Sequence, residues 1–402
     1  SGSRVYQKDG VQNELYTPDE KMEQGIPGGD IFLTIDGAIQ FFTELELTKI
    51  QHIYHPKWAA AVVLEPRTGR ILAAASIPAL NPVDPASAPK MEGASHWMNR
   101  VFSAEYTPGS TFKPLIMGMA LDRGLVDLSE KIDCEGGRWR YRSRTVRDSH
   151  EGRYGELKPE GILIQSSNVG MSKIILRMVP EDTPKGGAAF IPIREKLDLL
   201  GLGKRPGIFQ GPFEEDGLIR DLSLWTTTYS LVSLAFGREI AVTPIQMASA
   251  FAVLANDGIY IPPRLIDRIV TADGKTVTPP DAQSYRVYGQ EASRNVKDML
   301  VQVVEQGSGK KARIPGIKVA AKTGTAEKLP ERKEVTSSFI AFAPADNPVL
   351  LVLVVVDEPQ GKHYASDVVA PHVKAILERG LSHLNITNDE QACADSLREC
   401  RK

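Results

Sequence analysis

The chain has 402 residues, of which 42% are hydrophobic and 24% are charged. This is the composition of a globular protein, and it excludes a disordered, fibrous or membrane-embedded chain. The 48 Lys and Arg nearly balance the 50 Asp and Glu, so charge does not predict nucleic acid as a partner. The longest apolar run, Val349 to Val356, is too short for a bilayer, which needs about 20 residues.

Both ends of the chain are polar. Residues 1–29 are rich in Lys, Asp, Glu, Gln and Gly, which predicts a linker or the remnant of an N-terminal module. The opening tripeptide at 1–3, Ser-Gly-Ser, is typical of what an expression tag leaves, so we expect the natural N-terminus to be missing. Residues 386–402 form a C-terminal tail to which the sequence assigns no role.

Neither the cysteines nor the histidines predict a metal site or a cofactor. Cys134, Cys393 and Cys400 form no Cys-x-x-Cys pair, and Cys393 and Cys400 could pair only across a loop. His52 and His55 lie three residues apart on a predicted helix face, but no third ligand accompanies them. We therefore expect neither a metal nor a cofactor, and the redox state of the three cysteines stays open.

Apolar runs predict five main strands, two near the start of the chain and three near its end. They are Trp58–Leu64, Arg70–Ser76, Ile317–Lys322, Ser337–Ala343 and Leu350–Val356. Turn-forming residues at 65–69 join the first two into a hairpin, and a further short strand is predicted at Asp30–Ile35. Because both ends of the chain supply strands, one antiparallel sheet that brackets an inserted segment is the simplest assembly.

Four helices have clear sequence signals. Asp36 is a good N-cap for a helix carrying Ile39, Phe42 and Leu45, and Thr243-Pro244-Ile245-Gln246 is a capping box. Further helices are predicted from about Ser110 to Arg123 and over Asp367–Leu381. The fold class is therefore α+β, with a five-stranded antiparallel sheet flanked by helices. We expect one main domain at 30–385, with a mostly helical insertion at about 124–310.

The first chemical motif is Ser110-Thr111-Phe112-Lys113, which follows a Pro-Gly turn and opens a helix. Ser110 and Lys113 lie one helical turn apart, so a lysine of lowered pKa could remove the proton of the serine hydroxyl. The start of a helix also favours developing negative charge. A helix cap followed by a surface lysine is the plain alternative, and Ser-x-x-Lys is frequent by chance.

Two further motifs follow along the chain. Ser166-Ser167-Asn168 stands between apolar residues and offers two hydroxyls and an amide, although an N-cap cluster would look the same. Lys322-Thr323-Gly324-Thr325 closes the predicted strand that begins at Ile317. Its lysine and threonines can bind a carboxylate, and Gly324 lets another backbone approach closely. A glycine bulge in an edge strand is the alternative.

The three motifs in this order resemble the Ser-x-x-Lys, Ser-Asp-Asn and Lys-Thr-Gly set of penicillin-binding proteins and serine β-lactamases. The second motif departs from that set, since it has a serine in the middle. The resemblance to class B penicillin-binding proteins extends beyond the motifs to the nucleophile region at 99–114, the stretch at 165–170 and residues 243–258. It covers about residues 30–385. Asn168 resembles the division-type (septal) branch, whereas elongation-type relatives tend to have Asp.

The resemblance implies a role for each motif residue. Ser110 would be the acylated nucleophile, Lys113 its base and Ser166 a proton relay, and Asn168 would bind the peptide amide. The substrate carboxylate would lie against the third motif: Lys322, Thr323, Gly324 and Thr325. The oxyanion hole would consist of the backbone N–H groups of Ser110 and Thr325.

The resemblance also implies a peptidoglycan D,D-transpeptidase that cross-links stem peptides ending in D-Ala-D-Ala and is acylated by β-lactams. A β-lactamase or D,D-carboxypeptidase of the same fold, or a β-lactam-sensing receptor domain, would use the same residues. Further implied partners are cell-division or elongation membrane proteins, reached through a missing N-terminal region. The implied location is the outer side of the bacterial cytoplasmic membrane, with an anchor absent from this chain.

Overall fold

The structure of the protein is a computed structural model, and it describes most of the chain. The described ranges, besides short pieces between residues 4 and 22, are 28–79, 98–149, 154–209, 213–280, 283–329 and 334–386. Most of the predicted linker at 1–29, nearly all of the tail at 386–402, and Cys393 and Cys400 lie outside them. The chain divides into two compact units, Ser1–Thr34 with Arg264–Asp281, and Ile35–Pro263 with Ala282–Lys402.

The small unit contains a three-stranded antiparallel sheet. Its strands, in spatial order, are β16 (Thr276–Val277), β15 (Ile266–Val270) and β5 (Asp30–Leu33). The strand predicted at Asp30–Ile35 is therefore confirmed, although it ends two residues early. The guanidinium of Arg268 lies 3.9 Å from the ring centroid of Phe32, which shields one face of an otherwise exposed aromatic side chain.

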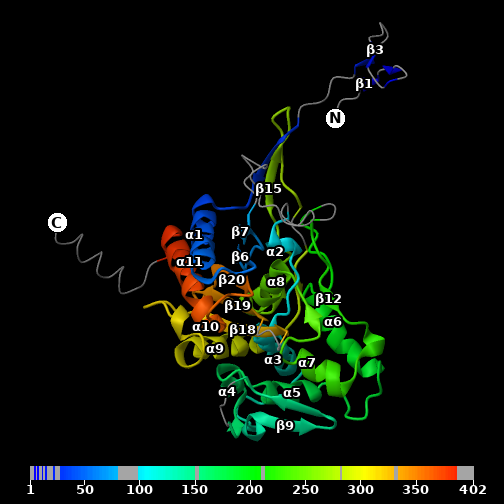
Figure 1. Cartoon of the computed structure of the whole chain (residues 1–402), viewed down its shortest axis with the longest axis vertical. Helices are drawn as coiled ribbons and strands as arrows, with labels where there is room; N and C mark the ends of the chain where they lie inside the picture. Colours follow the sequence, from blue (N-terminus) through cyan, green and yellow to red (C-terminus); the bar gives the residue numbers. More distant parts are fainter. Residues whose placement is uncertain are drawn as a thin grey trace, which may run out of the picture. The chain divides into compact units, whose positions relative to one another are not determined.

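A five-stranded antiparallel sheet forms the centre of the large unit and confirms the predicted fold class (Figure 1). Its strands, in spatial order, are β18 (Ala320–Leu329), β19 (Glu334–Ala343), β20 (Leu350–Asp357), β6 (Trp58–Leu64) and β7 (Ile71–Ile77). The predicted bounds of the third main strand, Ile317–Lys322, are wrong. β18 starts three residues later and continues through the whole Lys-Thr-Gly motif, because polar edge residues such as Thr325 pair in register with β19.

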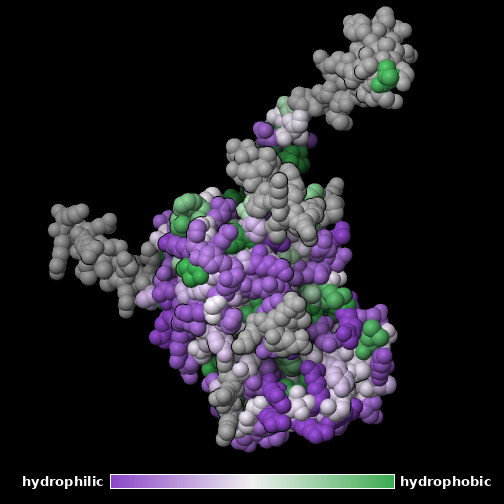
Figure 2. All heavy atoms as spheres, in the orientation of Figure 1, coloured by the Kyte–Doolittle hydropathy of each residue, from purple (hydrophilic) through white to green (hydrophobic). Residues whose placement is uncertain are grey.

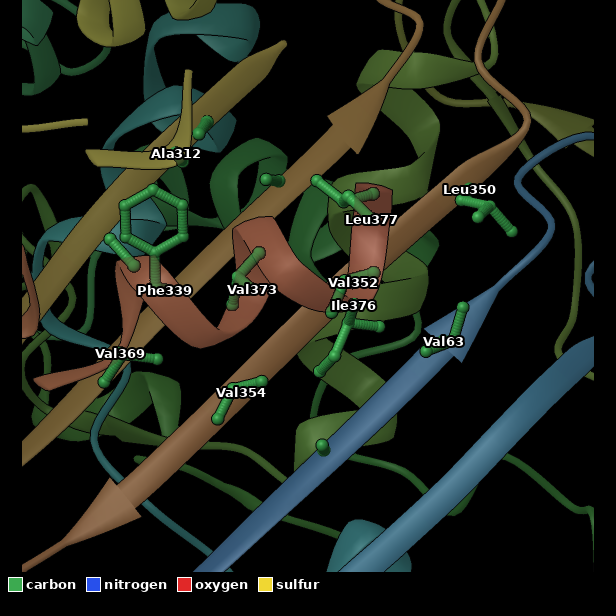
Figure 3. Close-up of a cluster of buried hydrophobic side chains, with 14 of the residues drawn as sticks. Val63, Ala312, Phe339, Leu350, Val352, Val354, Val369, Val373, Ile376 and Leu377 are labelled. Carbon is green, nitrogen blue, oxygen red and sulfur yellow. The ribbon is translucent and has the colours of Figure 1, made fainter. Parts of the chain in front are cut away.

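Helices cover both faces of this sheet, which explains why its strands read as continuous apolar runs. Helices α1 (Gly37–Tyr54) and α11 (Ala370–His383) lie on one face, and α8 (Pro244–Ala255) packs on β20 and β6. Figure 3 shows Val373, Ile376 and Leu377 of α11 over Val352 and Val354 of β20. These side chains belong to the main hydrophobic core, and they are fully or almost fully buried.

The predicted helix ends are largely confirmed. The Asp36 side chain accepts hydrogen bonds from the backbone of the first turn of α1, and Thr243 and Gln246 form both halves of the capping box of α8. In α1 the predicted face is partly wrong, since Ile39 is buried but Phe42 and Leu45 are only half-buried. The helix predicted at Asp367–Leu381 is two helices, α10 (Ala365–Val368) and α11, because Pro371 restarts the helix in its first turn.

The middle of the chain is less helical than predicted. Besides α8 it holds the helices α4 (Pro159–Ile164), α5 (Asn168–Leu176), α6 (Ile191–Leu199), α7 (Val232–Leu234) and α9 (Gln290–Gln306). Besides the β15–β16 pair of the small unit, its described part holds four short antiparallel pairs: β8 (Ile132–Asp133) with β11 (Glu156–Leu157), β9 (Arg138–Tyr141) with β10 (Arg144–Arg147), β12 (Leu218–Ile219) with β13 (Ile240–Ala241), and β14 (Ile259–Tyr260) with β17 (Tyr285–Arg286). Strands of two to four residues are too short to show the alternation from which strands are predicted. Among the described helices, none is long and apolar enough to cross a membrane.

Candidate active site

The predicted nucleophile lies in a tight turn beside the edge of the central sheet. Ser110 belongs to the short 3₁₀ turn η3 (Gly109–Phe112), which leads directly into α3 (Lys113–Asp122). Figure 1 shows α3 between β18 and α5, and η3 itself contacts β18. The Ser110 side chain is half-buried, and within the described residues its hydroxyl makes no hydrogen bond. A hydroxyl in this state is available to a substrate.

Lys113 is fully buried, and three oxygen atoms hold its ammonium group. Its Nζ donates to the backbone carbonyl of Ser166 at 2.5 Å, to Ser166 Oγ at 3.1 Å and to Asn168 Oδ1 at 2.7 Å. A lysine has three N–H donors, so all of them are used. Burial lowers the pKa of Lys113 well below its ordinary value, and the charge of Lys322 lowers it further, while Asp148 opposes both.

Lys322 reaches the same place from β18. It is also fully buried, and its Nζ donates to Ser166 Oγ at 3.0 Å. Burial lowers the pKa of Lys322 to about 7. Two buried lysines that share one neighbour repel each other when both are charged, so the pair favours a state in which only one of the two amines is charged.

Ser166 is the centre of the cluster, and its backbone is adapted to that position. Its φ angle of 55° lies in the left-handed region, which a serine occupies at a cost of about 1 kcal/mol. This conformation turns the residue between α4 and α5 and brings its hydroxyl and its carbonyl to the lysines. With a lysine on each side donating, the remaining O–H of Ser166 can donate to a further group.

Asp148 supports the second motif, and the sequence analysis missed it. Its carboxylate accepts hydrogen bonds from Ser167 Oγ at 3.0 Å and from the backbone N–H groups of Asn168 and Val169 at 2.6 and 3.0 Å. It therefore caps α5 from outside the motif, alongside Ser167, whose hydroxyl accepts from the Gly170 N–H. The one signal was a single carboxylate at the end of an arginine-rich stretch, at no characteristic spacing from the motif.

Two glycines permit the close packing of the nucleophile turn. A Cβ at Gly324 would lie 2.8 Å from the carbonyl oxygen of Pro108 and 2.9 Å from Thr111 Cγ2, which confirms the close approach predicted there. A Cβ at Gly237, where φ is 71°, would lie 2.1 Å from the carbonyl oxygen of Gly109. The turn is therefore packed against β18 and against the segment that carries Gly237, and Ser110 has little room to shift.

The two threonines of the third motif already have partners. Thr323 Oγ1 lies 2.7 Å from Ser308 Oγ, and Thr325 Oγ1 accepts a long hydrogen bond of 3.4 Å from the backbone N–H of Ala365. Ser308, in the loop after α9, is a second residue that the sequence analysis did not identify. Both threonine side chains retain hydrogen-bonding capacity for a substrate oxygen.

In the part of the chain that the structure describes, no three His, Cys, Asp or Glu side chains gather in a group that could hold a metal ion. The chemistry of the cluster is instead that of hydroxyls and amines.

Comparison with known proteins decides the family. Residues 59–378 match the penicillin binding protein transpeptidase domain, which is most of the chain and includes all three motifs. The chain belongs to the penicillin-binding protein transpeptidase family. The match confirms the predicted resemblance, and the sheet with its helices is the transpeptidase fold of that family.

Individual relatives agree with this assignment. The chain is 33% identical over 385 residues to the probable peptidoglycan D,D-transpeptidase PenA of Neisseria gonorrhoeae, covering 94% of this chain and 60% of PenA. It is 30% identical over 404 residues to the peptidoglycan D,D-transpeptidase FtsI of Escherichia coli, covering 98% of this chain and 63% of FtsI. The chain therefore spans about 60% of the length of these penicillin-binding proteins.

The structure resembles solved members of the family. Penicillin-binding protein 3 of Mycobacterium tuberculosis, in complex with aztreonam, superposes with a TM-score of 0.79 at 26% identity. The superposition covers 96% of this chain and 88% of that one. The likeness thus extends over nearly the whole transpeptidase domain.

Proposed function

We propose that the chain is the catalytic part of a peptidoglycan D,D-transpeptidase, which cross-links stem peptides through an acyl-enzyme on Ser110. The observation that carries this proposal is the Ser166 hydroxyl, held between Lys113 Nζ at 3.1 Å and Lys322 Nζ at 3.0 Å. Two buried amines of lowered pKa around one hydroxyl form a proton-transfer group beside the nucleophile turn.

The proposed reaction begins with attack by Ser110 Oγ on the carbonyl carbon between the last two D-Ala residues. The Ser110 proton passes to the neutral amine of Lys113, and the backbone N–H groups of Ser110 and Thr325 stabilise the oxyanion. The carbon–nitrogen bond breaks, and the departing D-Ala amine takes up the proton through Ser166. An amine from a second stem peptide then attacks the ester, which forms the cross-link and restores the Ser110 hydroxyl.

The other motif residues hold the substrate in this scheme. Lys322 attracts the terminal carboxylate, while Thr323 and Thr325 donate hydrogen bonds to it. Asn168 binds the peptide amide with its side chain and fixes the Lys113 ammonium with Oδ1. A β-lactam would acylate the same serine, and a relative of this fold is known in complex with aztreonam.

The proposal extends to where the protein works. Peptidoglycan lies outside the cytoplasmic membrane, so we place the domain on that side, joined to an N-terminal anchor and to cell-division or elongation proteins. Asn168 and the similarity to FtsI favour the division (septal) branch.

The test is a transfer assay with a soluble peptide that ends in D-Ala-D-Ala and a D-amino acid as acceptor. Released D-Ala and the transfer product are measured by mass spectrometry while the acceptor concentration is raised. We expect the transfer product to grow with acceptor at the expense of hydrolysis, and Ser110→Ala to abolish both. Hydrolysis that is insensitive to acceptor would identify a carboxypeptidase and overturn the proposal.

A further inference from the structure

The hairpin β9–β10 concentrates positive charge in a chain whose net charge is slightly negative. Five arginines and no acidic residue lie between Arg138 and Arg147, in a protein of net charge −2. The hairpin does not contain the proposed nucleophile or either buried lysine. Its charge is therefore not explained by the chemistry of the site.

One face of the hairpin packs on the protein. Val146 is buried, and Lys173 of α5 places its ammonium 5.3 Å from the ring centroid of Trp139. Arg144 donates to the backbone carbonyl of Tyr229 at 2.8 Å. Arg142, in the turn, donates to the carbonyl of Glu181. The charges of these two arginines are used in docking the hairpin onto the body of the protein.

The opposite face, which we call the arginine face, consists of Arg138, Arg140, Thr145 and Arg147. Register places Arg138 opposite Arg147 and Arg140 opposite Thr145, and partners in an antiparallel pair point to the same side. All four side chains are exposed. Within the described residues, none of the three guanidinium groups has a hydrogen bond, an ion pair or a ring contact.

This arrangement costs stability in the absence of a ligand. Like charges directly opposite each other on two strands are destabilising, and Arg138 and Arg147 are such a pair. The neighbouring carboxylates are used elsewhere, since Asp148 caps α5 and Glu135 pairs with Lys173. None of the described carboxylates pairs with the arginine face, which therefore suits an anion from another molecule.

The chemistry of the arginine face defines the anion. Guanidinium groups bind carboxylates and phosphates through paired hydrogen bonds. Neighbours two apart on a strand are about 6.6 Å apart, which suits acidic groups spaced along an extended polymer. The face carries no apolar side chain to insert into a lipid layer, so a membrane surface fits it less well. In Figure 2 the end of the molecule where Figure 1 places β9 is mostly hydrophilic.

We propose that the arginine face binds the free carboxylates of peptidoglycan stem peptides, outside the catalytic cluster. The choice of polymer rests on the proposed function. The hairpin is joined to the cluster, because the carbonyl of Arg147 accepts a 2.8 Å hydrogen bond from Asn168 Nδ2 and the next residue, Asp148, caps α5. Wall polymer bound here is therefore held beside the site that cross-links it.

The experiment is co-sedimentation of the full chain with purified peptidoglycan sacculi. The variant carries Arg138→Gln, Arg140→Gln and Arg147→Gln. The matched control carries Lys57→Gln, Arg294→Gln and Lys318→Gln, which remove the same charge from exposed residues elsewhere. We expect the arginine variant to bind on the order of tenfold more weakly, as three exposed ion pairs predict, and the control to bind like the unaltered chain.

Two further arms keep the outcome independent of the variant's folding and of catalysis. Sacculi whose carboxylates have been amidated should retain the unaltered chain as poorly as native sacculi retain the arginine variant. Labelling of the variant by a fluorescent penicillin should stay within a few-fold of the unaltered chain, because the substitutions change only side chains and keep the Arg147 carbonyl that accepts from Asn168. Since sedimentation needs no turnover, failure of the transfer assay and failure of this proposal are separate results.

Three results would overturn the proposal. They are equal loss of binding in the control variant, undiminished binding of the unaltered chain to amidated sacculi, and binding to phosphatidylglycerol vesicles in preference to sacculi. The last result would identify the ligand as a membrane surface.

Discussion

The carboxylate of Asp148 accepts a 2.6 Å hydrogen bond from the backbone N–H of Asn168. Through that bond the end of the arginine hairpin positions the residue whose Oδ1 holds the Lys113 ammonium. The negative charge of Asp148 also opposes the lowering of the Lys113 pKa. Asp148 is therefore a positioning residue that acts on the proposed base both through geometry and through charge.

Asp148→Asn should slow acylation by a β-lactam and shift its pH dependence. Removing the negative charge lowers the pKa of Lys113 further, so the neutral amine forms at lower pH and the ascending limb of the rate moves to lower pH. The rate at the plateau should fall about fivefold, because the weakened cap costs about 1 kcal/mol in holding Asn168 and Lys113 in place. The measurement is the second-order labelling rate with a fluorescent penicillin between about pH 5 and about pH 9.

Asp133→Asn is the matched control for this variant. Asp133 caps a neighbouring turn by accepting from the Glu135 N–H, and it does not contact the second motif. Its pH profile should coincide with that of the unaltered chain. If Asp148→Asn lowers the rate but leaves the midpoint of the ascending limb in place, Asp148 is structural only.

Lys113→Ala should slow acylation far more than it weakens the initial binding of the drug. General-base assistance is worth roughly a hundredfold to ten-thousandfold, and alanine removes the amine that we propose as the base. Stopped-flow labelling separates the binding step from the acylation step. Lys173→Ala, which removes a half-exposed lysine of α5, should label at the normal rate. An acylation rate within a few-fold of normal in Lys113→Ala would exclude Lys113 as the base.

Gly237→Ala should impair acylation although residue 237 carries no chemistry. Its Cβ would lie 2.1 Å from the carbonyl oxygen of Gly109, so the nucleophile turn must move. Gly124→Ala is the control, because Gly124 also has positive φ but a Cβ there meets nothing within 4 Å. We expect Gly124→Ala to lose about 1 kcal/mol of stability and keep its labelling rate. Equal labelling rates in the two folded variants would show that the packing at Gly237 does not position Ser110.

A buried ion cluster between α1 and α11 should make stability depend on pH. Glu46 Oε2 lies 2.8 Å from His372 Nδ1, and Glu46 Oε1 lies 2.7 Å from Lys49 Nζ. Burial raises the pKa of Glu46, but His372 and Lys49 outweigh it, and the net pKa is below the usual value. Because the folded pKa is lowered, this stabilisation is present above the unfolded pKa of about 4.3 and is lost as pH falls through the folded value.

Glu46→Gln should therefore lose about 3 kcal/mol of unfolding free energy at neutral pH, and the loss should shrink below about pH 4. Urea unfolding at several pH values measures it. Glu378→Gln removes an exposed partner of Lys374 and should cost about 0.5 kcal/mol or less at every pH. A loss of the same size for both variants, or a loss for Glu46→Gln that persists in acid, would contradict this account.

The central sheet could be predicted because both of its faces are covered. Strands such as β6 and β20 are buried along their whole length, so they appear in the sequence as unbroken apolar runs. The edge strand β18 borders the site and carries polar side chains, so its apolar part marks only its beginning. The short strand pairs in the middle depend on tertiary contacts, which local sequence patterns do not contain.

The site could be predicted where chemistry dictates spacing. Ser110 and Lys113 lie one helical turn apart, and that relation is readable from the sequence. Lys113 and Lys322 meet at Ser166 although they are 209 positions apart in the chain. Only the recognised motifs could suggest that they lie close together, and only the structure gives the geometry of their contact. Asp148 and Ser308 act through backbone and hydroxyl contacts that follow no local pattern, and no sequence signal distinguishes them from surface residues.

The central claim, acylation of Ser110 by a transpeptidase site, is tested most directly by mass spectrometry of the chain after reaction with penicillin. Free drug is removed, the intact mass is followed over time, and the modified peptide is sequenced. We predict a single adduct on Ser110 that persists for many minutes, because no described carboxylate forms a hydrogen bond with Ser110, Lys113, Ser166 or Lys322 and none is therefore a candidate to activate water on the ester. An adduct on another residue, such as Ser166, or loss of the adduct within seconds with repeated turnover of the drug, would contradict the account.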